Sequence, residues 1–247
     1  MGEINNNRNP VPKSKIRIFL LFFVPSLLIV GMIIYSNFWQ ANQPINEIVI
    51  TGNKYLSKTK IQNQIYQHIL TNNPNSLNYD YIKNIILQNQ FISKCDFYTN
   101  YPNKIIISLK VKNILAEGSD EKGIEYYLTE DGEMIKRGDI RVGFNLPIID
   151  FAKIPKSNKK NIYVELANFL KKYYLLERLQ VKAKHIWWDN EGVCFTILDN
   201  IIVRVGNLSS IEEKFLKFEI YFNTILKELE NKPSFIDLRW ANQVVTH

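Results

Sequence analysis

Residues suited to catalysis or metal binding are few and scattered in this 247-residue chain. The three histidines, His68, His185 and His247, include no pair with the H-x-x-x-H spacing that places two ligands on one helix face. A site that joined them to Cys95 or Cys194 would require long-range convergence that no motif indicates. The sequence therefore predicts no metal site and no cysteine-based catalysis.

Two other clusters have simpler structural interpretations. Glu130-Asp131 leads into Gly132, a combination typical of a turn. Neighbouring acids on a strand or turn point apart, so they do not form the carboxylate pair of a glycosidase. Trp187-Trp188 is suited either to stacking on a sugar or to hydrophobic anchoring between a helix and a strand, and we favour anchoring. Because G-x-S-x-G, G-x-G-x-x-G and P-loop motifs are also missing, we expect no enzyme, no cofactor and no small-molecule substrate.

The charge distribution argues against nucleic acid as a partner. The formal net charge is +7, and residues 1–17 contribute +3 of it, from four basic residues and one acid. The remaining excess is spread among residues of both signs, without the basic block that a phosphate backbone requires.

An uncharged stretch, Ile18–Tyr35, has about the minimum length for a membrane-spanning helix. Phe38 and Trp39 follow it, as is typical at a lipid–water boundary. A cleaved signal peptide would need a small-residue cleavage site, and a buried core helix would have a polar face. We therefore predict a signal anchor in contact with membrane lipid, with the basic end in the cytoplasm.

The cysteine count excludes a disulfide framework. One bridge between Cys95 and Cys194 and two buried, unpaired thiols remain as alternatives, and we favour the unpaired thiols.

The first half of the region that follows the predicted membrane anchor contains both strands and helices. Gly52-Asn53 marks a turn, and Tyr101-Pro102-Asn103 marks another between the last two strands. In the second of these strands, alternate apolar residues predict one buried face: Ile105, Ile107, Leu109 and Val111. The predicted order is strand, helix, helix, strand, strand, at residues 45–51, about 57–69, about 81–90, 91–100 and 104–112.

The residue pattern in the second half of the extracytoplasmic region predicts a mixed or antiparallel sheet with two packed helices, so the predicted fold class is α+β. The predicted elements are a helix at 162–173, a hairpin at 193–197 and 201–205, a helix at 211–229 and a strand at 235–240. The spacing of the apolar stripe in the 211–229 helix fits a coiled coil or packing on the sheet, and we favour the sheet. The stripe comprises Ile211, Phe215, Phe218, Phe222, Ile225 and Leu229.

The motifs and their order along the chain resemble the FtsQ/DivIB family of bacterial division proteins. A strand–GN–helix–helix–strand–YPN–strand order after a signal anchor resembles a POTRA domain. The later motifs are ILAEG at 114–118, YYLTEDGEMI at 126–135, LPIIDF at 146–151 and FIDLRW at 235–240. The chain lacks the family's Glu-Arg near Lys112-Asn113, has Trp240 in place of the usual tyrosine, and has Gln243 where glycine is common.

The resemblance implies a domain order and a location. The implied location is the inner membrane at the division septum, with a single span and the C-terminal domains outside the cytoplasm. The implied segments are a cytoplasmic tail at 1–17, a transmembrane anchor at 18–36, a linker at 37–44, a POTRA domain at 45–115 and a β-domain at 116–247.

The resemblance also implies a non-catalytic scaffold that binds FtsB-like and FtsL-like bitopic division proteins through its C-terminal strand. Other divisome proteins would bind the POTRA domain. Trp240 is expected either to anchor the partner or to pack in the core, and Arg239 either to clamp an acidic partner or to pair with Asp237 or a glutamate. The implied partner-binding residues are Arg239, Trp240, Asn242, Gln243, Val244 and Val245. The rival interpretations are a signal-anchored cell-envelope enzyme and a secretion or outer-membrane assembly factor.

Overall fold

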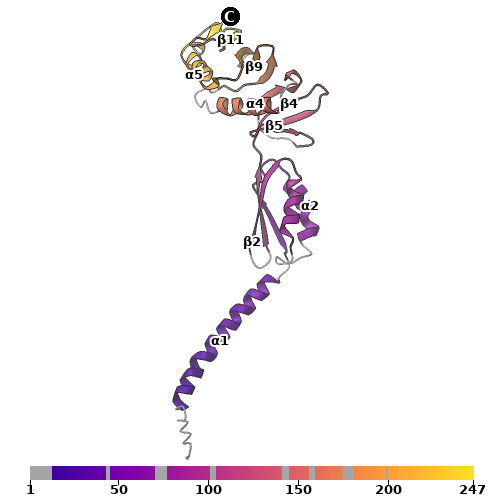
Figure 1. The fold of residues 1–247 in the computed structure, drawn as a ribbon, viewed down its shortest axis with the longest axis vertical. Coiled ribbons are helices and arrows are strands. Elements are labelled where there is room, and N and C mark those ends of the chain that lie inside the picture. Colours follow the sequence, from indigo (N-terminus) through magenta and orange to yellow (C-terminus); the bar gives the residue numbers. More distant parts are fainter. Residues whose placement is uncertain are drawn as a thin grey trace, which may run out of the picture. The chain divides into compact units, whose positions relative to one another are not determined.

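The computed structural model describes residues 13–42, 45–69, 77–100, 104–140, 145–155, 159–174, 181–198 and 200–247. The chain divides into two compact units (Figure 1). The first comprises residues 1–51, 58–86 and 95–109, and the second comprises residues 52–57, 87–94 and 110–247.

The N-terminal helix α1 runs from Lys13 to Ala41. Its Leu21–Trp39 segment has a mean hydropathy of 2.0, none of it is buried, and it is long and apolar enough to cross a membrane. The Asn42 side chain donates a hydrogen bond of 2.8 Å to the Phe38 carbonyl and closes the last turn. The helix therefore continues into the segment 37–44, which we expected to be a linker. Residues 1–12 of the expected tail lie outside the described residues.

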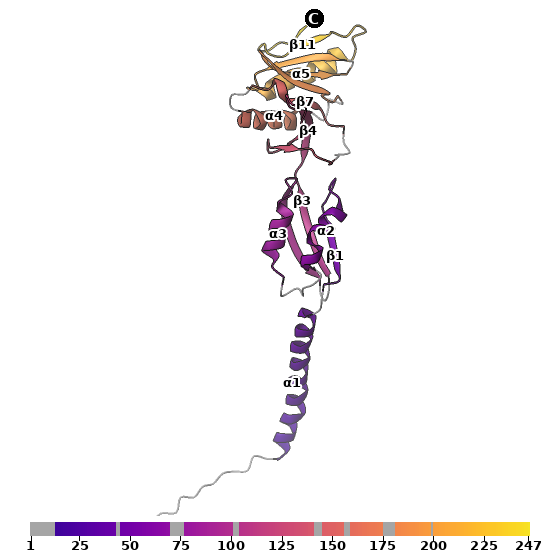
Figure 2. The same ribbon diagram turned by 90° about the vertical axis from the view of Figure 1, so that its right-hand side faces the viewer.

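The rest of the first unit has the predicted strand–helix–helix–strand–strand order. The central strand of its three-stranded sheet is β3, which pairs with β1 in parallel and has β2 on its other side. The two helices lie together on one face of this sheet (Figure 2). The elements are β1 (Glu47–Thr51), α2 (Lys58–Ile69), α3 (Tyr79–Leu87), β2 (Ile92–Asn100) and β3 (Lys104–Val111).

The predicted alternation along β3 is confirmed, because all four apolar residues of the expected inner face are buried. The helices bury isoleucines that recur at four-residue spacing: Ile61, Ile65 and Ile69 on α2, and Ile82 and Ile86 on α3. The predicted YPN turn at 101–103 lies outside the described residues.

The second unit contains a nine-stranded mixed sheet in the order β12-β11-β10-β9-β8-β7-β4-β5-β6. Three neighbouring pairs are parallel, β10 with β11, β4 with β7 and β7 with β8. The first strands are β4 (Ile114–Ser119), β5 (Glu125–Thr129), β6 (Met134–Lys136) and β7 (Ile148–Asp150). The later ones are β8 (His185–Asp189), β9 (Gly192–Ile197), β10 (Ile201–Gly206), β11 (Phe235–Asp237) and β12 (Val245–Thr246).

Helices α4 (Lys159–Tyr174) and α5 (Ile211–Tyr221) share a core with alternate residues of β9 and β10. Aromatic rings dominate this core, and Tyr173 lies 5.2 Å from Phe195 and 5.6 Å from Phe215 between ring centroids. The buried hydroxyl of Tyr173 donates a hydrogen bond of 2.9 Å to the Val181 carbonyl. The same faces of β9 and β10 therefore hold both helices.

Packing of the last helix on the sheet is confirmed, but the apolar stripe breaks after Phe222. A π-helical segment, Phe222–Leu226, follows α5. Its i→i+5 hydrogen bonds put more residues into each turn than an α-helix has, so the side chains that follow are shifted around the helix axis. Leu226 is therefore buried, whereas Ile225 and Leu229, which we expected on the buried face, are 47% and 38% exposed.

Both cysteines are buried and free, as the favoured interpretation predicted. Trp188 packs against the core, which agrees with hydrophobic anchoring. The ring of Trp187 instead contacts His185, at 5.7 Å between centroids.

Candidate protein-binding edge

One edge of the nine-stranded sheet is formed by β12 rather than by the predicted 235–240 strand. Only Phe235–Asp237 forms β11, which pairs with β10 on one side and with β12 on the other. The Leu238 N–H still bonds the Arg204 carbonyl at 2.9 Å, after which the chain turns through Trp240 and Asn242. Asn242 has a φ of +58°, a left-handed conformation that asparagine tolerates. This turn reverses the chain, so the expected edge strand is covered by a second strand.

The pairing of β11 with β12 determines which main-chain groups face outwards. Phe235 and His247 exchange two hydrogen bonds, of 3.2 and 3.1 Å. Because bonded and non-bonded pairs alternate in an antiparallel ladder, the next pair, Ile236 with Thr246, is non-bonded. The N–H and C=O of Thr246 therefore point away from β11.

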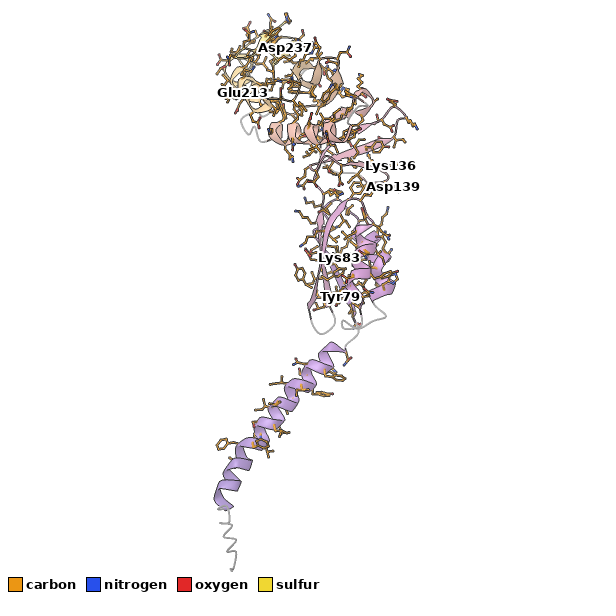
Figure 3. The ribbon with its side chains drawn as sticks, in the orientation of Figure 1. Tyr79, Lys83, Lys136, Asp139, Glu213 and Asp237 are labelled. Carbon is orange, nitrogen blue, oxygen red and sulfur yellow. The ribbon has the colours of Figure 1, made fainter. Side chains whose placement is uncertain are left out.

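Arg239 is held inside its own chain. Its Nη2 lies 2.7 Å from Oδ2 of Asp237, and its Nε lies 3.0 Å from Oδ1 of the same carboxylate. Partial burial raises the pKa of the Asp237 carboxyl, but hydrogen bonds from the Arg239 side chain and main chain outweigh this effect and leave the pKa below its ordinary value. Of the two expectations for Arg239, the structure therefore contains the internal pairing. Asp237 lies at the C-terminal end of the second unit (Figure 3).

A second arginine joins this network. Arg204 on β10 binds Asp189 at 2.9 Å, and both Arg204 and Arg239 contact Oε2 of Glu191 in the β8–β9 turn. The glycine at 206 permits this approach, because a Cβ there would lie 2.8 Å from Cγ of Arg239. Charged groups from three separate segments thus meet beside the C-terminal turn.

Lys217 organises the turn from the helix side. Its ammonium donates hydrogen bonds to the carbonyls of Leu238, Trp240 and Gln243. The neighbouring Lys214 is buried and bonds the Asn207 carbonyl at 2.6 Å. Burial lowers the pKa of Lys214, and the nearby charge of Lys217 lowers it further.

The other predicted partner-binding residues lie on this turn or on β12. Trp240 is 53% exposed, so the alternative that it packs in the core is wrong. Asn242 and Gln243 are exposed, whereas Val244 and Val245 are half-buried, and Val244 packs against the core. A cavity of about 440 Å³ separates the turn from the start of α5, and its lining includes Leu216, Lys217 and Trp240. The edge thus combines an exposed aromatic ring, free main-chain groups and basic side chains.

Sequence reasoning missed Lys217, Glu191 and Arg204. Lys217 directly precedes Phe218 on α5, so the helix period places it beside the buried stripe, but its approach to the C-terminal turn has no local signal. The meeting of Glu191 with the two arginines has no local signal. Among the described residues, no group of three or more histidine, cysteine or acidic side chains is placed to hold a metal ion.

Two protein families match the chain. The family described as FtsQ/DivIB, C-terminal related, matches residues 118–247. The POTRA domain, FtsQ-type, matches residues 43–110. A comparison with curated proteins found no match.

Proposed function

The chain belongs to the FtsQ/DivIB family of cell-division proteins, and from this membership we propose that it is a scaffold of the bacterial divisome. Proteins of this family are generally non-catalytic. In the proposed role the chain binds small bitopic proteins of the FtsB and FtsL type and helps to position septal cell-wall synthesis.

The free edge of β12 is the observation that carries this proposal. Thr246 directs its N–H and C=O groups away from β11, so an extended segment of a partner can add to the sheet as a further strand. Strand addition uses main-chain hydrogen bonds for affinity and side-chain pockets for specificity.

The side chains of the turn have distinct proposed roles. Trp240 provides an exposed aromatic anchor, and such residues contribute strongly to binding energy at interfaces. Arg239 offers a guanidinium to an acidic partner. Asn242 and Gln243 form a polar rim, while Val244 and Val245 extend the apolar edge.

The apolar helix α1 supports a single-pass anchor in the plasma membrane. We place the basic tail in the cytoplasm and the two folded units outside it, according to the positive-inside rule. The proposed boundaries remain 45–115 for the POTRA domain and 116–247 for the β-domain. In this arrangement the POTRA domain is free to bind other divisome proteins at the septum.

The test compares proteins that co-purify with the tagged full chain from native membranes. Both Thr246→Pro and Thr246→Ala remove the threonine hydroxyl. Only Thr246→Pro also removes the outward main-chain N–H, so Thr246→Ala is the matched control. We expect wild type and Thr246→Ala to recover small bitopic coiled-coil proteins, and Thr246→Pro and Trp240→Glu to lose them. If all four chains recovered the bitopic proteins equally, this edge would be excluded as their binding site. If wild type recovered no bitopic protein, the scaffold role would be rejected.

A further inference from the structure

In the first unit, the ends of several elements gather where the chain enters the three-stranded sheet. β1 and β3 are parallel, and Glu47 pairs with Lys104, so both strands begin at the same end of the sheet. Only three residues separate β2 from β3, which keeps the last residues of β2 at this end as well. We call it the entry end, because the chain reaches it from α1.

Ring contacts bring both helices to the entry end. The last turn of α2 meets the first turn of α3 through His68 and Tyr81, whose ring centroids lie 5.2 Å apart. Tyr79, at the start of α3, lies 5.5 Å between centroids from Phe97, near the end of β2. Figure 3 shows Tyr79 at this end of the sheet. Aromatic side chains from α2, α3 and β2 therefore surround the entry end.

Three tyrosines at the entry end expose about half of their surface. Tyr66 on α2 is 53% exposed, Tyr81 on α3 is 50% exposed and Tyr98 on β2 is 57% exposed. Among the described residues between 45 and 111, no other large hydrophobic side chain is exposed to this degree. A tyrosine joins an apolar ring to a polar hydroxyl and is therefore suited to the boundary between lipid and water.

The chain that joins the entry end to the membrane anchor is short. Ala41 ends α1 and Glu47 begins β1, so the six residue steps between them can span at most about 20 Å. Phe38 and Trp39, near the end of α1, are suited to the lipid–water boundary. The entry end is thus held within reach of the lipid headgroups, at a high effective concentration.

The charges near the three tyrosines cancel. Glu47 and Lys104 form an ion pair at 2.9 Å. The acids and bases at the starts of β1, α3 and β3 and along the second half of β2 are equal in number: Glu47, Asp80 and Asp96, and Lys83, Lys94 and Lys104. Without a net positive charge, the entry end has no electrostatic preference for anionic lipids. Its tyrosines are the side chains suited to a bilayer surface.

We propose that Tyr66, Tyr81 and Tyr98 form a membrane-docking surface, which seats the entry end of the POTRA domain among phospholipid headgroups. This inference rests on the membrane anchor of the proposed function and is independent of the scaffold role. The rings contact the upper acyl region while their hydroxyl groups stay hydrated. Docking of this kind requires no particular headgroup charge, and it limits the swing of the domain about its tether.

The test labels the full chain with hydroxyl radicals and measures the labelling rate of each tyrosine by mass spectrometry. The chain is compared in phosphatidylcholine nanodiscs and in an amphipol, which keeps α1 in solution without a lipid surface. We expect the three tyrosines of the docking surface to react about threefold more slowly in nanodiscs. Tyr174 on α4, which is 41% exposed and belongs to the second unit, should react equally in both.

Two variants of Tyr98 form a matched pair. Tyr98→Glu places a charge on the docking surface, so we expect Tyr66 and Tyr81 to react equally in nanodiscs and in amphipol. Tyr98→Trp keeps an aromatic ring suited to the boundary and should retain the protection of both. Because the comparison is made within each variant, a general loosening of the fold would raise both rates and leave their ratio unchanged. NaCl at about 0.5 M should leave the protection in wild type intact.

Equal labelling of the three tyrosines in nanodiscs and in amphipol would overturn the inference. Protection found only in native membranes would overturn it too, because the surface would then bind a protein, and so would protection that is lost in salt. If docking fails while Thr246→Pro still loses the bitopic proteins, the scaffold role stands. Protection in nanodiscs, with no bitopic protein recovered by wild type, supports the docking surface and rejects the scaffold role.

Discussion

The ammonium of Lys217 on α5 donates a hydrogen bond to the main-chain carbonyl of Trp240 and so ties the C-terminal turn to the helix. We expect Lys217→Met to loosen this turn, because it removes the donor to all three carbonyls. The expected cost in unfolding free energy is about 1 kcal/mol, since the site is partly solvated. Hydrogen exchange of residues 238–247 measures the loosening, and Lys232→Met, an exposed change, is the control. Unchanged exchange would show that the turn holds its shape without Lys217.

A second prediction concerns the pH dependence that Asp237 causes. Because its folded pKa lies below the ordinary value of 3.8, the ionised carboxylate stabilises the fold at neutral pH. This contribution is present above pH 3.8 and is lost as the pH falls through the lowered pKa. We expect Asp237→Asn to cost about 1–3 kcal/mol at pH 7, less than for a fully buried pair because Arg239 is 31% exposed. Thermal unfolding between pH 2 and 7 measures both effects, and the variant should show the weaker acid dependence.

Two neighbouring tyrosines on α4 provide a matched pair for the core. Tyr173→Phe leaves the buried Val181 carbonyl without its 2.9 Å hydrogen bond, so we expect a loss of about 1–2 kcal/mol. Tyr174→Phe removes a 3.2 Å bond to the Leu115 carbonyl from a side chain that is 41% exposed. Water can replace that bond, and the expected loss is below about 0.5 kcal/mol. Denaturant unfolding followed by tryptophan fluorescence should rank the two variants in this order, and equal losses would contradict the assignment of the core.

The thiols should be almost unreactive in the folded chain. Burial raises the pKa of both Cys95 and Cys194 to about 11, so little thiolate exists at pH 8. We expect a disulfide-exchange reagent to titrate both thiols rapidly in denaturant and only slowly under native conditions. Rapid reaction of either cysteine in the native chain would show that its burial is transient.

Much of the fold follows from periodic apolar patterns. The alternation of Ile105, Ile107, Leu109 and Val111 specifies a strand with one buried face, and Ile61, Ile65 and Ile69 specify a helix face. The predicted stripe on the last helix agrees with the structure only as far as Phe222. The spacing of apolar residues contains no sign of the π-helical segment, so Ile225 was assigned to the wrong face.

The candidate site was less predictable, because its geometry arises from tertiary contacts. Two residues form β12, too few for a period, and its position depends on the turn at Trp240. The meeting of Glu191 with Arg204 and Arg239 joins three segments that no local motif connects. The sequence did place an aromatic side chain, Trp240, in the last strand region, with a partner anchor and core packing as alternatives. Its exposed ring excludes core packing.

The brevity of β12 would make the proposed binding edge selective. A strand of two residues offers too few outward main-chain groups to retain a stray extended peptide, and short edge strands are a recognised protection against unwanted sheet growth. A segment that stays must bring further contacts with the aromatic and charged side chains of the neighbouring turn. In the proposed strand addition, recognition at this edge would therefore require two conditions at once, an extended backbone and the right side chains. An unfolded envelope protein that meets only the first condition would dissociate before it could block the site.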